Sequence, residues 1–164
     1  FEPESVLRLL AWNQTRGIVA GAYESRKPGK VYILSLDGGN GVEGEQKSIA
    51  MDGWGLVKAY RVATGFMMIQ RQVFEKLRDL HPEWEYQAKG EETAYAFFDL
   101  AVMEGRFVGE DYLFCDRARE HGFEVWIDPT IKLGHMGITE FEGSFGEEYL
   151  YPLIKPVDSK KDAA

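Results

Sequence analysis

The sequence predicts an α/β fold in which a mixed sheet is flanked by helices. Two patterns support this class: apolar residues at helical spacing alternate along the chain with short β-branched runs, and turn residues separate these segments. A chain of 164 residues with 45% hydrophobic content can build one core and is too short for two domains. We therefore expect one domain over residues 1–154 and a loose polar tail over residues 155–164.

The first predicted elements are a helix and a buried strand. Pro3, Glu4 and Ser5 are typical of a first helical turn, and apolar residues then recur at helical spacing until Asn13, where we expect the helix to end. Residues 17–23 form a short β-branched run bounded by glycine, which is typical of a buried strand. The sequence therefore predicts that the chain begins with a helix, which a buried strand follows.

The middle of the chain predicts a hairpin, a strand and a second helix. Residues 31–36 resemble a strand that ends at a glycine-rich turn over 37–41, and residues 56–62 alternate between apolar and polar. Residues 64–69 predict a strand that leads directly into a helix, which Pro82 stops. The apolar positions of that helix are Val73, Phe74, Leu77 and Leu80.

The last third continues the alternation. Residues 94–103 are rich in aromatic side chains and predict a strand without clear ends. Residues 111–121 predict a helix that Gly122 closes in the left-handed conformation, and residues 123–127 predict a strand that ends at Asp128.

Composition excludes some partners. The formal charge of −8 and the lack of a basic run exclude a nucleic-acid surface, and a phosphorylated ligand would call for a divalent cation to offset the carboxylates. The lone Cys115 reads as a small buried apolar residue and fits a reducing compartment. No apolar run is long enough to span a membrane, so we expect a cytoplasmic protein.

Two adjacent acids, Glu110 and Asp111, stand at the predicted start of the third helix. Exposed backbone N–H groups and the positive end of the helix dipole hold carboxylates ionised there. The pattern leaves two interpretations open: plain helix capping, or a carboxylate that accepts a proton from an incoming hydroxyl.

Histidine offers one candidate ligand. His135 follows a short apolar run at Gly134, where the backbone can approach a ligand and the imidazole can point into a cleft. A structural role remains the alternative, because one ligand does not define a metal site. His81 and His121 read as helix-end residues that interact with the negative end of the dipole.

Other candidate binding residues are weaker. Thr64, Gly65 and Phe66 stand at the mouth of a strand, where a residue without Cβ lets a ligand or another part of the chain come close; a bulge or tight packing is the alternative. Trp54 and Trp84 lie in polar or glycine-rich surroundings that suit sugar stacking, and rim packing is the alternative.

Three blocks of the sequence resemble the C-terminal half of a GT-A-type glycosyltransferase of the family-2-like bacterial and phage type. Residues 63–77 resemble the glycine-containing segment that lines the donor and acceptor cleft. Residues 109–115 resemble the acidic motif whose Asp acts as general base in inverting members. Residues 133–135 resemble the C-terminal histidine that helps to hold the metal. The resemblance covers roughly residues 1–145.

The chain departs from the family pattern at its start. Residues 1–6 resemble the segment that follows the family's Asp-x-Asp metal motif, but no Asp-x-Asp occurs in the 164 residues. The nucleotide-binding N-terminal half is also absent from the sequence. We therefore expect a fragment, with further residues upstream of Phe1 or a partner chain that supplies the missing half.

The resemblance implies transfer of a sugar from a nucleotide-diphospho-sugar donor to a hydroxyl acceptor. Asp111 would be the general base, Glu110 would support it, Gly65 would leave room for the donor, and His135 would help to bind Mn²⁺ or Mg²⁺. Two alternatives stay open: a non-catalytic glycan-binding or assembly module, and a metal-dependent nucleotidyltransferase.

Overall fold

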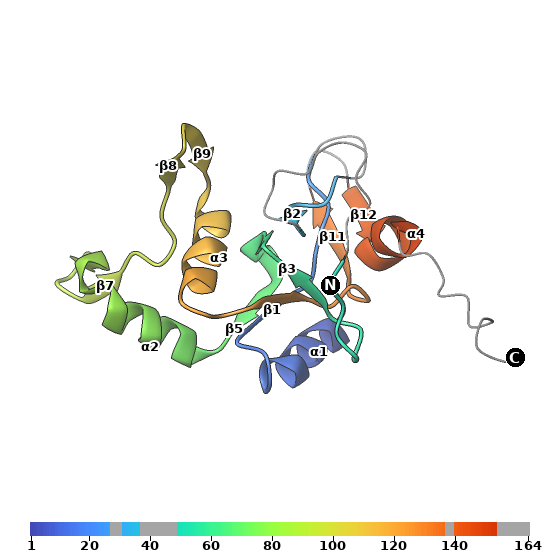
Figure 1. The fold of residues 1–164 in the computed structure, drawn as a ribbon, viewed down its shortest axis with the longest axis horizontal. Coiled ribbons are helices and arrows are strands. Elements are labelled where there is room, and N and C mark those ends of the chain that lie inside the picture. The colour runs from blue at the N-terminus through green and yellow to red at the C-terminus, as the bar shows by residue number, and fades with distance from the viewer. Residues whose placement is uncertain (27–30, 37–48, 137–139, 154–164) are drawn as a thin grey trace, which may run out of the picture.

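A four-stranded mixed sheet forms the centre of the molecule (Figure 1). The computed structural model describes residues 1–26, 31–36, 49–136 and 140–153. The strand order is β3-β10-β1-β5, with bounds β1 Ile18–Ala20, β3 Val57–Ala59, β5 Met67–Ile69 and β10 Val125–Ile127. The expected turn over 37–41 and the expected tail over 155–164 lie outside the described residues.

The two inner strands are parallel and the two edge strands are antiparallel to them. Ile18 of β1 pairs with Val125 of β10, although more than a hundred residues separate them in the sequence. Strand β5 pairs antiparallel with β1, and β3 pairs antiparallel with β10. Both inner strands are fully buried along their length, as their β-branched composition predicts. The predicted mixed α/β class is confirmed.

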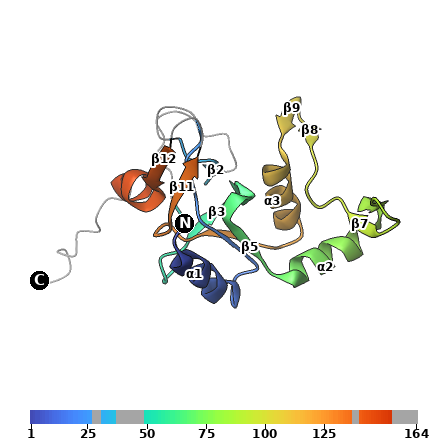
Figure 2. The same ribbon diagram turned by 180° about the vertical axis from the view of Figure 1, so that it is seen from behind.

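Helix α1 (Pro3–Asn13) covers one face of this sheet and begins with the proline that the sequence predicts for a first turn. It packs against β1 and β5 (Figures 1 and 2). Leu9 of α1 is buried together with Val19 and Trp126, whose side chains point to this face of β1 and β10. Because successive side chains along a strand point to opposite faces, the strands contribute to a separate hydrophobic core on each face of the sheet.

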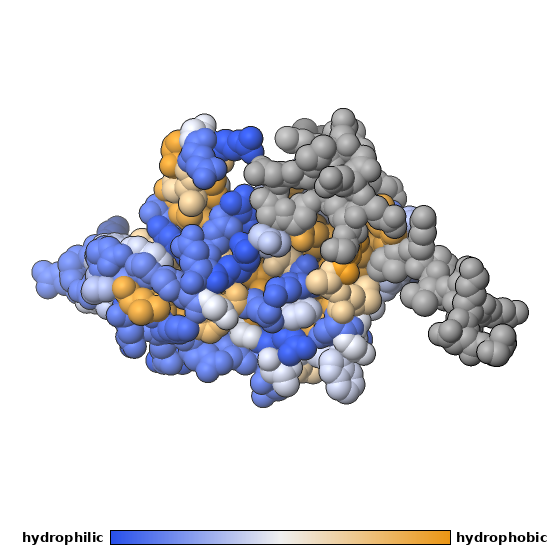
Figure 3. Space-filling view, viewed as in Figure 1, coloured by the Kyte–Doolittle hydropathy of each residue, from blue (hydrophilic) through white to orange (hydrophobic). Residues whose placement is uncertain are grey.

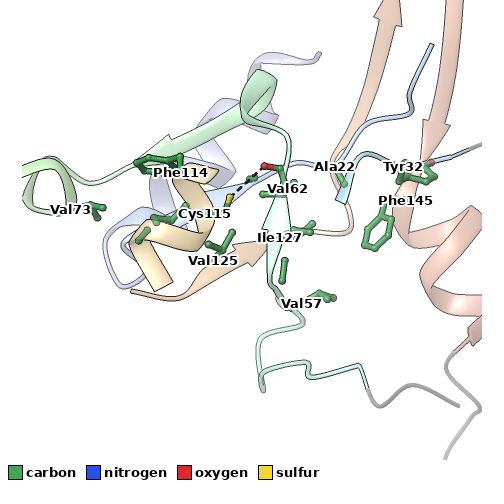
Figure 4. Packing of buried hydrophobic residues seen from close by; sticks show 14 of the residues in the cluster. Ala22, Tyr32, Val57, Val62, Val73, Phe114, Cys115, Val125, Ile127 and Phe145 are labelled. Atoms are coloured by element: carbon green, nitrogen blue, oxygen red, sulfur yellow. Dashed lines mark hydrogen bonds between the residues drawn. The ribbon is translucent and has the colours of Figure 1, made fainter. Parts of the chain in front are cut away.

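The opposite face carries the larger core, under α2 (Arg71–Leu80) and α3 (Glu110–Glu120). Val73 and Leu77 of α2 and Phe114 of α3 are fully buried here, and Figure 4 shows Phe114 and Cys115 directed toward the strands. Helix α3 ends as the sequence predicts, because Gly122 has φ +84°.

In the described part of the chain, four two-stranded pairs accompany the sheet. Their strands are β2 (Leu34–Ser35) with β4 (Arg61–Val62), β6 (Glu85–Gln87) with β7 (Thr93–Tyr95), β8 (Ala101–Met103) with β9 (Arg106–Val108), and β11 (Lys132–Met136) with β12 (Glu140–Ser144). The single strand expected over 94–103 is therefore wrong, since that stretch divides between two different hairpins.

Hairpin β8–β9 projects from the body of the molecule and presents apolar side chains. Val102 and Phe107 pair across the two strands and are 73% and 70% exposed. Figure 3 shows the orange patch that these strands form at the upper left. Strand β9 runs straight into α3, so the hairpin is attached to the helix that begins with the acid pair.

The described chain closes with a π-helical turn, η3 (Phe145–Leu150), and a short helix, α4 (Tyr151–Leu153). Phe145 is fully buried and packs edge-on against Tyr32, with ring centroids 5.2 Å apart. None of the helices within the described ranges is both long and apolar enough to cross a bilayer.

Candidate functional site

The candidate residues gather beyond the carboxyl ends of the parallel strands β1 and β10. Tyr23 follows three residues after β1, and β10 leads through Asp128 into β11, which carries His135. The short 3₁₀ helix η1 (Thr64–Phe66) lies beside them, because Gly21 N–H donates a 3.0 Å hydrogen bond to the Phe66 carbonyl. Ligands of α/β folds commonly bind at this end of a sheet.

Asp111 is held by a hydrogen bond from η1. The hydroxyl of Thr64 donates to Oδ1 of Asp111. The N-cap of α3 is Gly109, which offers no side-chain cap. Both acids lie in the first turn of α3, where the helix dipole favours a carboxylate, and the carboxylate of Asp111 in addition contacts η1, so the structure is compatible with both interpretations of the acid pair. Glu110, next to it, is exposed.

The close contact with Tyr23 leaves no room for a side chain at position 65. The backbone N–H of Gly65 donates a 3.2 Å hydrogen bond to the Tyr23 hydroxyl oxygen. A Cβ at Gly65 would come within 2.5 Å of that oxygen, which real side chains do not tolerate. The space beside Gly65 that the resemblance assigned to a donor is thus filled by Tyr23, and tight packing, the alternative interpretation, is what the structure shows.

Tyr23 also lies between the acids and the histidine. Its ring meets the His135 ring edge-on, with centroids 5.1 Å apart. Burial raises the pKa of Tyr23 above its ordinary value, and the negative charges of Asp111 and Glu110 raise it further. Asp111, Thr64, Gly65, Tyr23 and His135 therefore form one continuous chain of contacts.

The hydrogen bonds of His135 fix its tautomer. Its Nδ1 lies 2.7 Å from the backbone carbonyl oxygen of Glu24, so Nδ1 carries the proton and donates it. The Nε of Arg26 donates a 3.1 Å hydrogen bond to Nε2, which is therefore the acceptor.

This geometry fits His135 as a single metal ligand and no more. Metal-binding histidines commonly donate their second N–H to a carbonyl, as Nδ1 does here, but Arg26 would have to leave Nε2. Within the described ranges no three His, Cys, Asp or Glu side chains are grouped to hold an ion. Further ligands would have to come from elsewhere.

A small hollow of about 160 Å³ opens at this place. It is lined by Phe1, Tyr23, Gly65, Phe66, Leu133, Gly134 and His135. Because ligand pockets usually span about 300–1,000 Å³, this hollow suits one sugar or phosphate group rather than a whole nucleotide sugar. Phe66 closes one side together with Phe1, their ring centroids lying 5.0 Å apart.

A larger hollow of about 620 Å³ adjoins it on the other side of Leu133 and Gly134. Glu2, Glu147 and Glu148 line it, and Lys132 is paired with Glu147 at 3.0 Å. An anionic diphosphate would meet net negative charge here, so it would enter only together with a cation.

Trp54 does not belong to this group. It is 76% exposed in a turn held by Asp52, whose Oδ1 accepts from the N–H groups of Trp54 and Leu56. That turn precedes β3, at the edge of the sheet opposite β5 and η1. Trp84 is also elsewhere, stacked on His81 at the end of α2.

Sequence reasoning missed Tyr23 and Arg26. Tyr23 was counted as the end of a buried strand, although β1 ends at Ala20. A polar aromatic residue just past a short buried run was the available signal. Arg26 had no signal in the sequence, because its contact with His135 spans 109 positions.

Comparisons with known proteins leave the family undecided. No family model matches the chain, and neither the curated proteins nor the solved structures contain a match.

Proposed function

We propose that the chain is part of a glycosyltransferase that moves a sugar from a nucleotide-diphospho-sugar to a hydroxyl acceptor. The observation that carries the proposal is the hydrogen bond from Thr64 to Asp111, within the chain of contacts that continues through Gly65 and Tyr23 to His135. It supports a common site for the acid and the imidazole, which the resemblance to GT-A enzymes requires.

Asp111 acts as the general base. Thr64 engages Oδ1, so Oδ2 is the oxygen left to take the proton of the acceptor hydroxyl. As that proton moves to Oδ2, the acceptor oxygen bonds to the anomeric carbon, the bond from this carbon to the phosphate oxygen breaks, and the nucleoside diphosphate departs with the electron pair. The proton later passes from Asp111 to water.

The neighbouring residues position the reactants. Glu110 is exposed beside Asp111 and orients the acceptor. Thr64 holds the base, and Gly65, Phe66 and Tyr23 line the small hollow. His135 is one ligand for Mn²⁺ or Mg²⁺; the ion, when bound, would stabilise the negative charge that grows on the diphosphate.

The test uses the natural full-length protein with Mn²⁺ and a panel of nucleotide sugars. Asp111→Asn keeps the shape of the side chain but accepts no proton, so we expect donor binding to persist and nucleotide release to stop. Glu120→Gln is the matched control, because Glu120 is exposed at the other end of α3. Full activity of Asp111→Asn would refute the base assignment.

The same assay separates the alternatives. Donor binding with nucleotide release supports the transferase. Glycan or nucleotide-sugar binding without release in the unaltered protein supports a non-catalytic module. Pyrophosphate released from a nucleoside triphosphate and a sugar phosphate supports a nucleotidyltransferase.

A further inference from the structure

Two histidines meet at the far end of α3, away from the candidate site. His81 caps the C-terminus of α2 and His121 caps the C-terminus of α3. Their Nε2 atoms lie 2.7 Å apart, and their rings are tilted by 61°. His121 stands ten residues after Asp111, which is about 15 Å along a helix, so the pair is separate from the proposed catalytic residues.

His81 is fixed on three sides. Its Nδ1 lies 2.8 Å from Oε1 of Glu83, and its ring stacks on Trp84 with centroids 3.9 Å apart and planes 2° from parallel. A carboxylate oxygen accepts hydrogen bonds, so at this distance the ring nitrogen is the donor. His81 Nδ1 therefore carries a proton, and in neutral His81 the lone pair of Nε2 points at His121.

This is the arrangement of a metal-binding imidazole. A carboxylate that accepts from one ring nitrogen orients the ring and makes the other nitrogen a better donor to a metal. We propose that His81 and His121 bind a late first-row divalent ion such as Zn²⁺ or Ni²⁺ through their Nε2 atoms, with water in the remaining positions. The proposal does not depend on the proposed function.

Binding requires the two rings to move. Two Zn–N bonds of about 2.0–2.1 Å at a tetrahedral angle place the nitrogens roughly 3.3 Å apart, so the nitrogens would separate by about 0.6 Å and the rings would turn until both lone pairs point at the ion. On binding, the proton of the His121 Nε2–H moves to Nδ1 by exchange with water, and the ion takes its place between the rings. Both side chains are partly exposed, which leaves a route for the ion and its waters.

The surrounding charges are mixed. The C-terminal ends of α2 and α3 and the Glu83 carboxylate favour a cation. Against this, Lys76 Nζ donates a 2.8 Å hydrogen bond to the His121 carbonyl, and the Arg117 guanidinium lies 4.2 Å from the Trp84 ring centroid and pairs with Asp99. With two nitrogens and these cations nearby, we expect affinity in the micromolar range rather than that of a closed structural zinc site.

The two imidazole ligands also determine which metal ions the site prefers. Imidazole nitrogens favour Zn²⁺, Ni²⁺ and Cu²⁺, whereas Mg²⁺ and Mn²⁺ favour oxygen ligands. An ion that joins the ends of two helices binds only the folded chain, so saturating metal raises the melting temperature. Mg²⁺ at the same concentration should not.

The test is calorimetric titration of the chelator-treated chain with ZnCl₂ and NiCl₂ at neutral pH, with melting temperatures recorded in parallel. We expect one ion per chain and a stabilised fold. His121→Gln is the informative variant, because its side-chain amide can still donate to His81 Nε2 yet is a poor metal ligand. It should bind at least about 10-fold more weakly, and Glu83→Gln should lose roughly 10-fold through the outer contact.

Glu4→Gln is the matched control, because like Glu83→Gln it removes one exposed carboxylate, but from the first turn of α1. This variant should bind Zn²⁺ as the unaltered chain does. Absence of saturable Zn²⁺ or Ni²⁺ binding would overturn the proposal. So would binding that persists unchanged in His121→Gln or weakens as much in Glu4→Gln as in Glu83→Gln.

Discussion

The hydroxyl of Thr64 and the carboxylate of Asp111 are joined by a hydrogen bond across 47 positions of the sequence. Thr64 belongs to a short 3₁₀ helix, and Asp111 stands in the first turn of α3. The bond engages Oδ1 of Asp111, and Oδ2 is the oxygen that the proposed mechanism assigns to the proton. This contact connects two of the three sequence blocks that resemble a glycosyltransferase.

Replacing Thr64 by Val should slow transfer without weakening donor binding. A hydrogen bond to a charged group contributes about 1.5–3 kcal/mol, so a carboxylate that loses its orientation should cost roughly 10-fold or more in kcat. Thr64→Ser keeps the hydroxyl and should retain most of the activity. Steady-state kinetics of the full-length protein measure the difference, and equal rates for the Val and Ser variants would contradict it.

Gly65→Ala should destabilise the fold through Tyr23. The new methyl would lie 2.5 Å from the Tyr23 hydroxyl oxygen and 2.8 Å from Cζ, so either η1 or the ring must move. Overpacking of this kind costs about 1–3 kcal/mol of unfolding free energy. Urea unfolding of the single variant measures the loss.

Tyr23→Phe tests the cause of that loss. Alone it removes one hydrogen bond and should cost about 1 kcal/mol. In the Gly65→Ala background it removes the closest clashing atom, so the double variant should be more stable than the sum of the single losses predicts. Additive losses would show that Gly65 serves another purpose.

Cys115 should be inert in the folded protein. Its side chain is fully buried, and its Sγ donates to the Val62 carbonyl at 3.6 Å (Figure 4). Burial raises the pKa of the thiol to about 11, so little thiolate exists at neutral pH. A chromogenic disulfide reagent should modify the denatured chain at once and the native chain only at the rate of opening. Rapid labelling of native protein would contradict this burial.

Much of the fold followed from local patterns. The helix over 111–121 was predicted with its closing glycine, and the strand after it was predicted because Val125, Trp126 and Ile127 form a compact apolar run. Both elements are buried, and a buried element shows in the sequence as apolar residues at regular spacing. The parallel pairing of β1 with β10 could not be predicted from local patterns, because it joins segments that are far apart in the sequence.

Hairpins β6–β7 and β8–β9 were missed for the opposite reason. All three residues of β6 are exposed, so burial does not alternate along that strand. The turn of β8–β9 is Glu104-Gly105, with φ +51° and +74°, and Glu-Gly is a weaker hairpin signal than Asn-Gly or Asp-Gly. In the site, Asp111 and His135 were proposed from motifs, whereas Tyr23 matters only through Gly65 and His135, which are distant in sequence.

Glu104 itself offers a stabilising change. Glu104 has φ +51°, in the left-handed region, where a residue with a Cβ is destabilised by roughly 1–2 kcal/mol; asparagine is destabilised less there, because its short side chain can hydrogen-bond locally. Glu104→Asn should therefore raise the unfolding free energy by about 0.5–1 kcal/mol if β8–β9 unfolds with the domain. Glu92→Asn is the control, because Glu92 does not have positive φ. A gain in the control equal to that of Glu104→Asn would point to surface charge instead of backbone strain.

Asp128 should make the fold sensitive to acid. Its side chain is 1% exposed beyond the end of β10, where Arg8 and Trp12 of α1 each donate to Oδ2 at 2.9 Å. Burial alone would raise the pKa of Asp128, but hydrogen bonds from Thr130, Trp12 and Arg8 outweigh it and hold this pKa below its ordinary value. The stabilisation is therefore complete above the ordinary pKa of an aspartate, about 4, and is lost as the pH falls from there through the lowered value.

Asp128→Asn removes the charge and should cost about 1–3 kcal/mol of unfolding free energy at neutral pH. Arg8 is 47% exposed and can return to water, which keeps the loss below that of a fully buried pair. Urea unfolding at a series of pH values should show the gap between variant and unaltered chain closing on acidification. Asp52, whose pKa is also lowered, is present in both chains and cancels from the comparison. Glu75→Gln is the control, because it breaks only the exposed pair with Arg71, and its unfolding free energy should stay close to that of the unaltered chain at every pH. If the difference for Asp128→Asn stayed constant down to pH 2, the charge of Asp128 would not be what stabilises α1 on the sheet.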